Sequence, residues 1–494
     1  MSATALSLSG RTLGAGELQR IKEKGKQWAV LHAVVMRPQN DPSSKSHVEY
    51  APMTLFPSPL PRGVLAEAKA LQPYFNRLIH QVAHDHEYLW HCLHNVVKVD
   101  DYTRRLWDIY TTVRKEGSAQ PLSLGLIRND FMLDVKSSCC EIQGMPQCLE
   151  LRQIEINTIA SSFAGLASGI WKVHRFTMAQ AGIECKPEQI PVNAPAEGIA
   201  KGLLSAWEHY GNQSASVLFV TMEVERNAVD QWWLESQLFS LSHNVCVRYT
   251  TLQYAYEHAT LTDDKRLLLD DGNEIAVIYY RDGYAPTHYH SEKEWDVRLM
   301  FERSKAIKCP SVHLQLAGCK KVQQELATPG AVERFIKDRE VCNGIRNTFA
   351  GQYTLDQGPE GDANANMAIN DPSHYVLKPQ REGGGNNIYG DEIAEMLQKM
   401  GSTEERSAYI LMERIFPWPQ NNHLLKEGKP CDLLEVISEL GIYGVYLGSA
   451  EEELVNEEVG HLLRTKAHTD NEGGIVAGFA TIDSPLIVEA PCVK

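Results

Sequence analysis

The sequence predicts an α/β protein that also contains antiparallel, α+β-type elements, and three observations support this class. Apolar residues recur with helical spacing in the N-terminal third, short β-branched runs alternate with helix-like stretches in the middle, and apolar runs broken by glycine follow near the end. Buried strands that alternate with helices are typical of a parallel sheet covered on both faces. With 494 residues, 43% of them hydrophobic, the chain is long enough for two or three domains.

The N-terminal third is predicted to begin with loops and then to become helical. Residues 37–46 and 56–63 are rich in proline and serine, which indicates loops. Two later segments place their apolar side chains on one helical face. The first stripe consists of Leu71, Phe75, Leu78, Ile79 and Val82, and the second of Tyr102, Leu106, Ile109, Tyr110 and Val113. We interpret both stripes as core packing.

The middle of the chain contains three predicted strands, at residues 216–222, 244–250 and 275–281. A helix-like stretch at residues 230–241 separates the first two, so we expect parallel pairing. Ligands of open α/β sheets usually bind in the crevice at the carboxyl ends of such strands. The loops that follow these strands are therefore candidate binding segments.

Polar side chains occupy those loops. Glu225, Asn227 and Gln231 follow the first strand and can hold an amino-acid head group. Arg281 ends the third strand and can form a bidentate pair with a carboxylate. An ordinary polar turn is the alternative for each of these segments.

The last third contains predicted strands within residues 375–379, 408–415 and 433–448. The third of them, "LLEVISELGIYGVYLG", is interpreted as two strands around a glycine turn. We therefore expect antiparallel pairing in this part of the chain.

Composition excludes several classes of function. The net charge of −15 lacks the basic balance of a protein that binds nucleic acid without sequence preference. No run of about 18 apolar residues predicts a membrane span, and the N-terminus lacks the pattern of a secretory signal. Eleven irregularly spaced cysteines favour reduced thiols and a cytosolic protein. We expect neither nucleic acid nor membrane as a partner.

The segment "YVLKPQREGGGNNIYG", residues 375–390, suits phosphate binding but fits neither common phosphate-binding loop. In a Walker A loop the lysine follows the glycines, whereas Lys378 precedes them. In a dinucleotide-binding loop the third glycine would fall on Ile388. What remains is a strand that ends in a cation, followed by Glu382 and glycines whose N–H groups can face phosphate oxygens. A glycine-rich surface loop fits the composition equally well.

A candidate magnesium site involves Glu155 and Asn157. They lie two positions apart in an extended run, so strand alternation places both side chains on one face. A carboxylate and an amide oxygen suit a hard cation such as Mg²⁺, and Glu382 can reach an ion that bridges phosphates. A solvated strand face is the alternative interpretation.

Several blocks and their order resemble eukaryotic glutathione synthetases. The blocks are "APMTLFPSPLP", "LGLIRND", "QIEINTIASSF", "EVERNAVDQ", "YYRDGYAP", "QLAGCKKVQQEL", "VLKPQREGGGNNIYG", "YILMERI", "ISELGIYGVY" and "GHLLRTKA…EGGIVAG". The resemblance runs from about residue 30 to the C-terminus. It implies a circularly permuted ATP-grasp fold with an inserted, doubly wound parallel-sheet domain that binds substrate and with a glycine-rich lid.

The resemblance also implies a division into domains. Residues 1–214 would hold the helical region and part of the ATP-grasp core, 215–317 the substrate domain, and 318–494 the nucleotide-binding region with its lid at about 350–425.

The implied activity is the ATP-dependent joining of γ-glutamylcysteine to glycine, with ATP and Mg²⁺ as cofactors. ATP would phosphorylate the cysteinyl carboxylate, and the glycine amine would attack the acyl phosphate. ADP, phosphate and glutathione would leave. The family resemblance further implies a homodimer, and we expect it in the cytoplasm.

The resemblance assigns roles to residues in each block. Arg128, Gly383 and Gly384 are implied in catalysis, and Glu155, Asn157 and Glu382 in magnesium binding. Residues implied in nucleotide binding are Glu155, Lys320, Lys378, Pro379, Gln380, Arg381, Glu382, Gly383, Gly384, Gly385, Asn386, Asn387, Tyr389, Met412, Glu413, Arg414, Ile415, Glu439, Lys466 and Glu472. Residues implied in binding the dipeptide or the acceptor amine are Arg128, Ile159, Ala160, Ser161, Ser162, Glu225, Arg226, Asn227, Gln231, Arg281, Asp282, Gly283, Tyr284, Arg464, Ile475 and Val476.

Two alternative functions stay open at this point. The "GGIVAG" turn carries bulkier residues than the family's "GGVAAG", which leaves room for a ligase that uses β-alanine or another amine. Glu472 stands where the family often has Asp, and Ala160 where it often has Ser. A non-catalytic nucleotide-binding regulator is the other alternative, and the presence of Glu155 and Lys378 argues against it.

Overall fold

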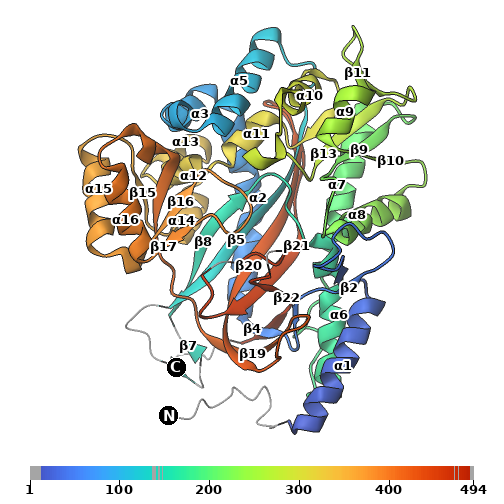
Figure 1. Cartoon of the computed structure of the whole chain (residues 1–494), viewed down its shortest axis with the longest axis vertical. Coiled ribbons are helices and arrows are strands. Elements are labelled where there is room, and N and C mark those ends of the chain that lie inside the picture. Colours follow the sequence, from blue (N-terminus) through green and yellow to red (C-terminus); the bar gives the residue numbers. More distant parts are fainter. Residues whose placement is uncertain are drawn as a thin grey trace.

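A computed structural model describes residues 13–135, 141–142, 145–146, 148–471, 473–476 and 478–489. This part of the chain is built around one large mixed sheet, and a smaller sheet stands beside it (Figure 1). Over these residues, no helix combines the length and the apolar character that a membrane crossing requires.

One half of the large sheet is parallel and comes from the middle of the chain. Its strands, in spatial order, are β10 (Val247–Thr250), β9 (Ser216–Val220), β13 (Ile275–Tyr280) and β14 (Ile307–Cys309). All of these neighbours pair in parallel, which confirms the predicted strands and their pairing. The strands β9 and β13 are buried along their whole length, which explains their unbroken apolar sequence.

The other half of the large sheet is mainly antiparallel. β5 (Ser123–Val135) lies next to β14 and pairs with β8 (Leu149–Asn157) and β20 (Leu433–Gly448). β20 also pairs with β21 (Glu453–Ala467) and β19 (Gln420–Leu425). The sheet continues through β3 (Met53–Thr54) and β22 (Thr481–Asp483) back to β21. Antiparallel pairing of the last third is therefore confirmed.

β20 is one continuous strand, so the prediction of two strands around a glycine turn is wrong. Gly441 and Gly444 lie inside the strand. A Cβ atom on Gly441 would lie 2.7 Å from Oδ1 of Asp130, and one on Gly444 would lie 2.1 Å from Oδ1 of Asn76. These glycines therefore mark a close approach of neighbouring side chains, not a reversal of the chain.

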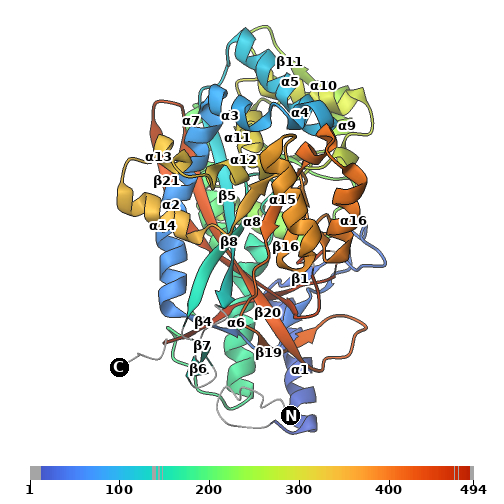
Figure 2. The same cartoon turned by 90° about the vertical axis from the view of Figure 1, so that its left-hand side faces the viewer.

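Helices cover both faces of the large sheet (Figures 1 and 2). One face carries α1 (Ala15–Leu31), α6 (Ala164–Gln180), α7 (Pro195–Tyr210) and α8 (Ala228–Leu241), and the other carries α2 (Arg62–His84), α3 (His86–Leu93), α5 (Asp101–Glu116) and α11 (Val312–Ala317). Side chains of β5 alternate accordingly: Leu124 and Leu126 join the first core, and Phe131 and Leu133 the second. The two predicted apolar stripes are the buried faces of α2 and α5.

The smaller sheet is antiparallel. Its strands, in spatial order, are β15 (Gln352–Thr354), β18 (Tyr409–Glu413), β16 (Tyr375–Pro379) and β17 (Ile388–Tyr389). Leu377 and Leu411 pack into a core with α15 (Pro359–Asn370) and α16 (Asp391–Met400) on one face. Alternation therefore turns Val376, Lys378 and Met412 to the opposite face, toward the large sheet. Figure 2 shows this unit standing in front of the large sheet.

The remaining elements are short. The helices are α4 (Val96–Val99), α9 (Leu252–His258), α10 (Glu292–Arg303), α12 (Lys320–Leu326), α13 (Ala331–Phe335) and α14 (Arg339–Thr348), with 3₁₀ turns η1 (Pro286–His288), η2 (Pro372–His374) and η3 (Glu404–Ala408). Two-stranded pairs are formed by β1 (Val35–Met36) with β2 (Glu49–Tyr50), β4 (Ser58–Pro61) with β23 (Pro485–Val488), β6 (Glu141–Ile142) with β7 (Met145–Pro146), and β11 (Ala259–Leu261) with β12 (Leu267–Leu269).

Candidate active site

A cleft of about 240 Å³ lies between the small sheet and the antiparallel half of the large sheet. Strand alternation explains why charged residues line it. Leu124 and Leu126 of β5 are buried beneath the helices, and the same strand face continues as Arg128 and Met132, which line the cleft. The switch from apolar to charged residues marks the point where the helical cover ends.

Many of the predicted nucleotide-site residues meet in this cleft. The predicted site residues that line it are Arg128, Glu155, Asn157, Lys320, Lys378, Arg381, Gly383, Gly384, Asn386, Asn387, Tyr389, Met412, Glu413, Arg414, Ile415, Glu439, Arg464 and Lys466. Pro379, Gln380, Glu382 and Gly385 belong to the same segment but are not among the lining residues. Glu472 lies outside the described residues.

Sequence reasoning missed a further group of lining residues. They are Met132, Ile154, Val376, Phe416, Pro417, Ile437, His468, Asp470, Asn471, Gly473 and Gly474. The period of two in a strand offered a signal for some of them. Val376 and Ile437 precede the predicted Lys378 and Glu439 by two positions, and so share their strand faces.

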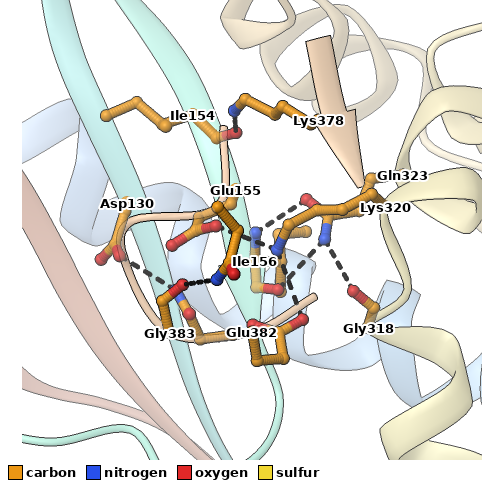
Figure 3. A network of polar contacts seen from close by, with 12 residues as sticks. Asp130, Ile154, Glu155, Ile156, Gly318, Lys320, Gln323, Lys378, Glu382 and Gly383 are labelled. Atoms are coloured by element: carbon orange, nitrogen blue, oxygen red, sulfur yellow. Dashed lines mark hydrogen bonds and ion pairs between the residues drawn. The ribbon is translucent and has the colours of Figure 1, made fainter. Parts of the chain in front are cut away.

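Lys320 bridges two carboxylates at one end of the cleft (Figure 3). Its Nζ lies 2.9 Å from Oε2 of Glu155 and 3.3 Å from Oε1 of Glu382. Although burial opposes the shift, the ammonium of Lys320 lowers the pKa of Glu155. Burial, opposed by Lys320 and reinforced by Glu155, raises the pKa of Glu382. The glycine loop is thereby held against the body of the protein by one buried cation.

Glu155, Asn157 and Glu382 fit a divalent cation. Glu155 and Glu382 lie close enough together to share one positive charge. Nδ2 of Asn157 donates to Oδ2 of Asp130 at 2.9 Å and to the carbonyl of Arg128 at 3.3 Å, which leaves its Oδ1 for a cation. Among the described residues, no three His, Cys, Asp or Glu side chains gather as metal ligands, so the amide oxygen completes this set.

Other cations of the cleft are anchored to backbone or acidic groups. Nζ of Lys378 donates to the carbonyl of Ile154 at 2.9 Å (Figure 3), and Nζ of Lys466 donates to the carbonyl of Asn471 at 2.5 Å. Arg381 pairs with Asp100 at 2.6 Å, which ties the start of the glycine loop to the N-cap of α5. The backbone contacts hold Lys378 and Lys466 in place along the cleft, where their positive charge suits a polyphosphate.

A second group of predicted residues gathers around Arg281, which is buried. Its Nη2 donates to Oγ of Ser162 at 2.7 Å, and its Nη1 donates to the carbonyl of Ser161 at 3.3 Å. Asp230, which sequence reasoning missed, pairs with Arg281 at 3.4 Å. Asp230 also accepts from the backbone N–H groups of Phe163 and Gly165, so it holds the loop between β8 and α6 in place.

Glu225, Asn227 and Gln231 lie together at the start of α8. Glu225 accepts from the backbone N–H of Asn227 at 2.8 Å and from Nε2 of Gln231 at 3.1 Å. Both polar side-chain atoms of Asn227 and Nε of Arg281 are buried without a hydrogen-bond partner in the described part of the chain. Because buried polar groups are normally paired, these atoms can serve as partners for a polar ligand.

The other predicted substrate residues occupy varied surroundings. Ile159 joins an apolar core, and Ala160 follows it with a φ of 52°, in the left-handed region. Arg226 donates to the carbonyl of Val476 at 2.9 Å. Ile475 is buried in the core, whereas Val476 is exposed, so Val476 is the accessible member of that pair.

Residues 282–284 lie between helix α5 and the glycine loop. Asp282 contacts His288 at 2.5 Å, and the carbonyl of Gly283 accepts from the hydroxyl of Tyr102 at 2.8 Å. Tyr284 lies near the glycine loop: a Cβ atom on Gly383 would be 3.6 Å from its ring.

Arg128 connects the cleft with the second group. Its Nη1 donates to the carbonyl of Ser162 at 3.3 Å, and the hydroxyl of Tyr443 donates to the same carbonyl at 2.5 Å. A guanidinium that lines the cleft therefore touches the loop that Arg281 holds. This arrangement can bring a phosphoryl donor and a carboxylate acceptor to one place.

Comparisons with known proteins find similar chains over nearly the whole length. A family described as "Eukaryotic glutathione synthase, ATP binding domain" matches residues 15–487. The chain is 45% identical to glutathione synthetase of Bos taurus over 473 residues, which cover 96% of this chain and 97% of that protein. It is 44% identical to glutathione synthetase of Homo sapiens, again over 96% of this chain and 97% of that protein. A glutathione synthetase-like effector of Globodera pallida shares the fold, with a TM-score of 0.76, 23% identity and coverage of 99% and 100% of the two chains.

Proposed function

Because the chain belongs to the eukaryotic glutathione synthase family, we propose that the cleft binds ATP and that the group around Arg281 binds γ-glutamylcysteine. The protein is an ATP-dependent ligase that makes glutathione. We place the reaction beside Arg128, because this residue lines the cleft and also contacts the loop held by Arg281. We further propose that the two sheets form a circularly permuted ATP-grasp fold, with the predicted division at residues 214 and 317.

The walls of the cleft suit a nucleotide. Val376, Met412 and Ile437 present apolar surface from both sheets, which can enclose a flat base. Lys320, Lys378 and Lys466 bring ammonium groups to the same cleft, where phosphates would lie. The glycines of residues 383–385 would bring backbone N–H groups near the γ-phosphate, because they lack side chains that would block a close approach.

Glu155, Asn157 and Glu382 would hold Mg²⁺. Bound there, the ion would neutralise phosphate charge and help to orient the phosphates for transfer. Lys320, which contacts both carboxylates, would keep them close together and balance their charge as the nucleotide binds.

Arg128 would act on the reacting carboxylate. The cysteinyl carboxylate attacks the γ-phosphoryl group, a C–O–P linkage forms, and ADP leaves. The Arg128 guanidinium would stabilise the negative charge that this transfer redistributes. The glycine amine then attacks the acyl carbon, and phosphate departs. No covalent bond to the protein is required, so positioning and charge stabilisation suffice.

The group around Arg281 would hold the dipeptide. Arg281 offers a guanidinium to a carboxylate, and the unpaired buried atoms of Asn227 offer a donor and an acceptor. Glycine would enter near Val476, which is exposed. An acceptor as small as glycine fits the family assignment, and the relatives do not favour β-alanine or a non-catalytic regulator.

We also propose a homodimer in the cytoplasm, as the sequence predicts. The described cysteines form no disulfide, which suits a reducing compartment. Light scattering of the purified protein tests the dimer: a mass of two chains supports it, and a mass of one chain contradicts it.

The activity is tested with purified protein, ATP, Mg²⁺ and γ-glutamylcysteine. We expect phosphate release only after an amine acceptor is added, and a greater kcat/KM with glycine than with β-alanine. Mass spectrometry of the product identifies glutathione. A preference for β-alanine would reassign the acceptor, and no phosphate release with either amine would reject the ligase.

A further inference from the structure

Asp130 is a fully buried carboxylate that three predicted site residues share. Arg128 forms a bidentate pair with it, through Nε to Oδ1 at 2.6 Å and through Nη2 to Oδ2 at 2.7 Å. Nδ2 of Asn157 donates to Oδ2 at 2.9 Å, and Nη2 of Arg464 donates to the same oxygen at 3.0 Å. Asp130 itself is not exposed, so it does not line the cleft.

The three donors come from three different strands and serve three different subsites. Arg128 lies on β5, Asn157 ends β8, and Arg464 lies on β21. Under the proposed function they would serve the reacting carboxylate, the cation and the dipeptide, respectively. Each of them enters the cleft from a backbone whose position is set by the sheet. Their side chains meet at one oxygen, Oδ2 of Asp130.

We propose that Asp130 is a positioning residue that orients Arg128, Asn157 and Arg464 together, so that the phosphoryl-acceptor, cation and dipeptide subsites are aligned. This inference rests on the proposed function for the roles of its three partners. The inference is argued from the hydrogen bonds that the buried carboxylate of Asp130 accepts from these three residues.

Charge gives the first reason. Arg128 and Arg464 bring two guanidinium groups to the same buried place, where they would repel each other without an anion between them. Asp130 contacts both, and Glu439 pairs with the same Nη2 atom of Arg464. The bidentate geometry also fixes the plane of the Arg128 guanidinium, which a single contact would leave free to rotate.

The orientation of the Asn157 amide gives the second reason. An amide can turn over and exchange its oxygen with its nitrogen, and only the oxygen can bind a hard cation. Oδ2 of Asp130 and the carbonyl oxygen of Arg128 can only accept hydrogen bonds, so the amide nitrogen of Asn157 must face them. Asp130 thereby keeps the amide oxygen available to the cation.

Gly441 gives the third reason. It pairs with Asp130 across β20 and β5, and a Cβ atom there would lie 2.7 Å from Oδ1 of Asp130 and 2.9 Å from Cδ of Arg128. Only glycine leaves space for this ion pair. The pair can therefore be disturbed by a substitution at Gly441 that leaves every charge in place.

The test compares Asp130→Asn and Gly441→Ala with the wild type. Replacing a partner that orients ligating groups typically lowers affinity or activity by about 10- to 100-fold. We expect Asp130→Asn to lower kcat/KM for γ-glutamylcysteine by about this factor. We expect it to weaken Mn²⁺ binding as well, measured without nucleotide by electron paramagnetic resonance. Gly441→Ala should also lower kcat/KM and weaken Mn²⁺ binding. It serves as the test if Asp130→Asn does not fold.

Glu302→Gln is the matched control. Glu302 is also buried and pairs with a buried guanidinium, that of Arg298 at 3.2 Å, but it lies on α10 outside the site. The Glu302→Gln variant should have a lower melting temperature, with kcat/KM and Mn²⁺ affinity at wild-type values. Wild-type kcat/KM and Mn²⁺ affinity in a folded Asp130→Asn protein would overturn the inference. An inactive wild type would instead reject the proposed function, and Mn²⁺ affinity would still test Asp130.

Discussion

Glu382 joins the glycine loop to the body of the protein through its contact with Lys320. Its chemistry follows from surroundings that the local sequence does not contain. Burial and Glu155 raise its pKa, while Lys320 opposes the shift. A carboxylate in such a place favours a cation as its partner, which is the basis for placing Mg²⁺ there.

Replacing Glu382 with Gln should lower kcat by about 100-fold or more, because a metal ion supplies several kcal/mol of charge stabilisation to the transition state. Binding of γ-glutamylcysteine, measured by calorimetry, should change much less, because the dipeptide is held around Arg281. Glu395→Gln, an exposed change on α16, is the control for loss of one charge. A near-normal kcat in Glu382→Gln would remove Glu382 from the metal site.

At the scale of elements, α12 connects the small sheet with the large one. Nζ of Lys321 lies 2.7 Å from Oγ1 of Thr354 at the end of β15 and 3.0 Å from Asp356. The backbone N–H of Lys321 donates to Oε1 of Gln380, which directly follows β16. Adjacent lysines of one helix therefore hold the start of the small sheet and, through Lys320, its glycine loop. That the small sheet acts as a lid stays a prediction.

The glycine loop should become more resistant to proteolysis when nucleotide binds. Residues 383–386 are exposed, and a run of glycines gains order on contact with phosphates. Limited digestion with proteinase K, followed by mass spectrometry, should show less cleavage within 381–390 when ATP and Mg²⁺ are present. The exposed turn at residues 427–430, outside the small sheet, should be cut at an unchanged rate. Equal cleavage of the glycine loop with and without ATP would argue against closure.

At the scale of the whole molecule, three histidines with neighbouring rings join α2 to α11. The ring centroids of His80 and His84 are 4.2 Å apart, and those of His84 and His313 are 4.8 Å apart. Burial and His84 lower the pKa of His80 to about 4, with Glu453 and the Ser449 carbonyl opposing. Burial likewise lowers the pKa of His84, and burial with the other two rings and Lys308 lowers that of His313.

These histidines should make the protein less stable in mild acid. They are neutral when folded, whereas the unfolded chain binds protons below its ordinary pKa of about 6.5. Their stabilising contribution is complete above that pH and is lost as the pH falls toward 4. Each such group contributes a slope of up to about 1.4 kcal/mol per pH unit to the free energy of unfolding.

Replacing His313 with Phe keeps an aromatic ring beside His84 and removes one titrating group. The dependence of the unfolding free energy on pH, measured with urea between pH 7.5 and 5, should therefore become less steep. His290→Gln, at an exposed position, should leave the slope unchanged. An unaltered slope in His313→Phe would show that these three histidines do not govern the acid sensitivity.

Local patterns in the sequence were sufficient for the class of fold, whereas the family resemblance supplied most of the predicted residues that line the cleft. Strand and helix periodicities are local properties, so the parallel strands, the stripes of α2 and α5 and the strand that carries Lys378 were all predicted correctly. Strand alternation could also have predicted that Val376 and Ile437 line the cleft. The long strand β20 was not, because a glycine at a turn and a glycine at a close approach look alike along the chain.

Only the tertiary structure decided which charges meet. Asp130 and Arg464 are 334 positions apart, and neither segment indicates that the two side chains share a hydrogen bond. The same holds for Asp230 with Arg281 and for Lys320 with Glu382. Residue type and local spacing specify what a side chain can do, but the low dielectric of a buried site makes its behaviour depend on the partners that the fold brings beside it.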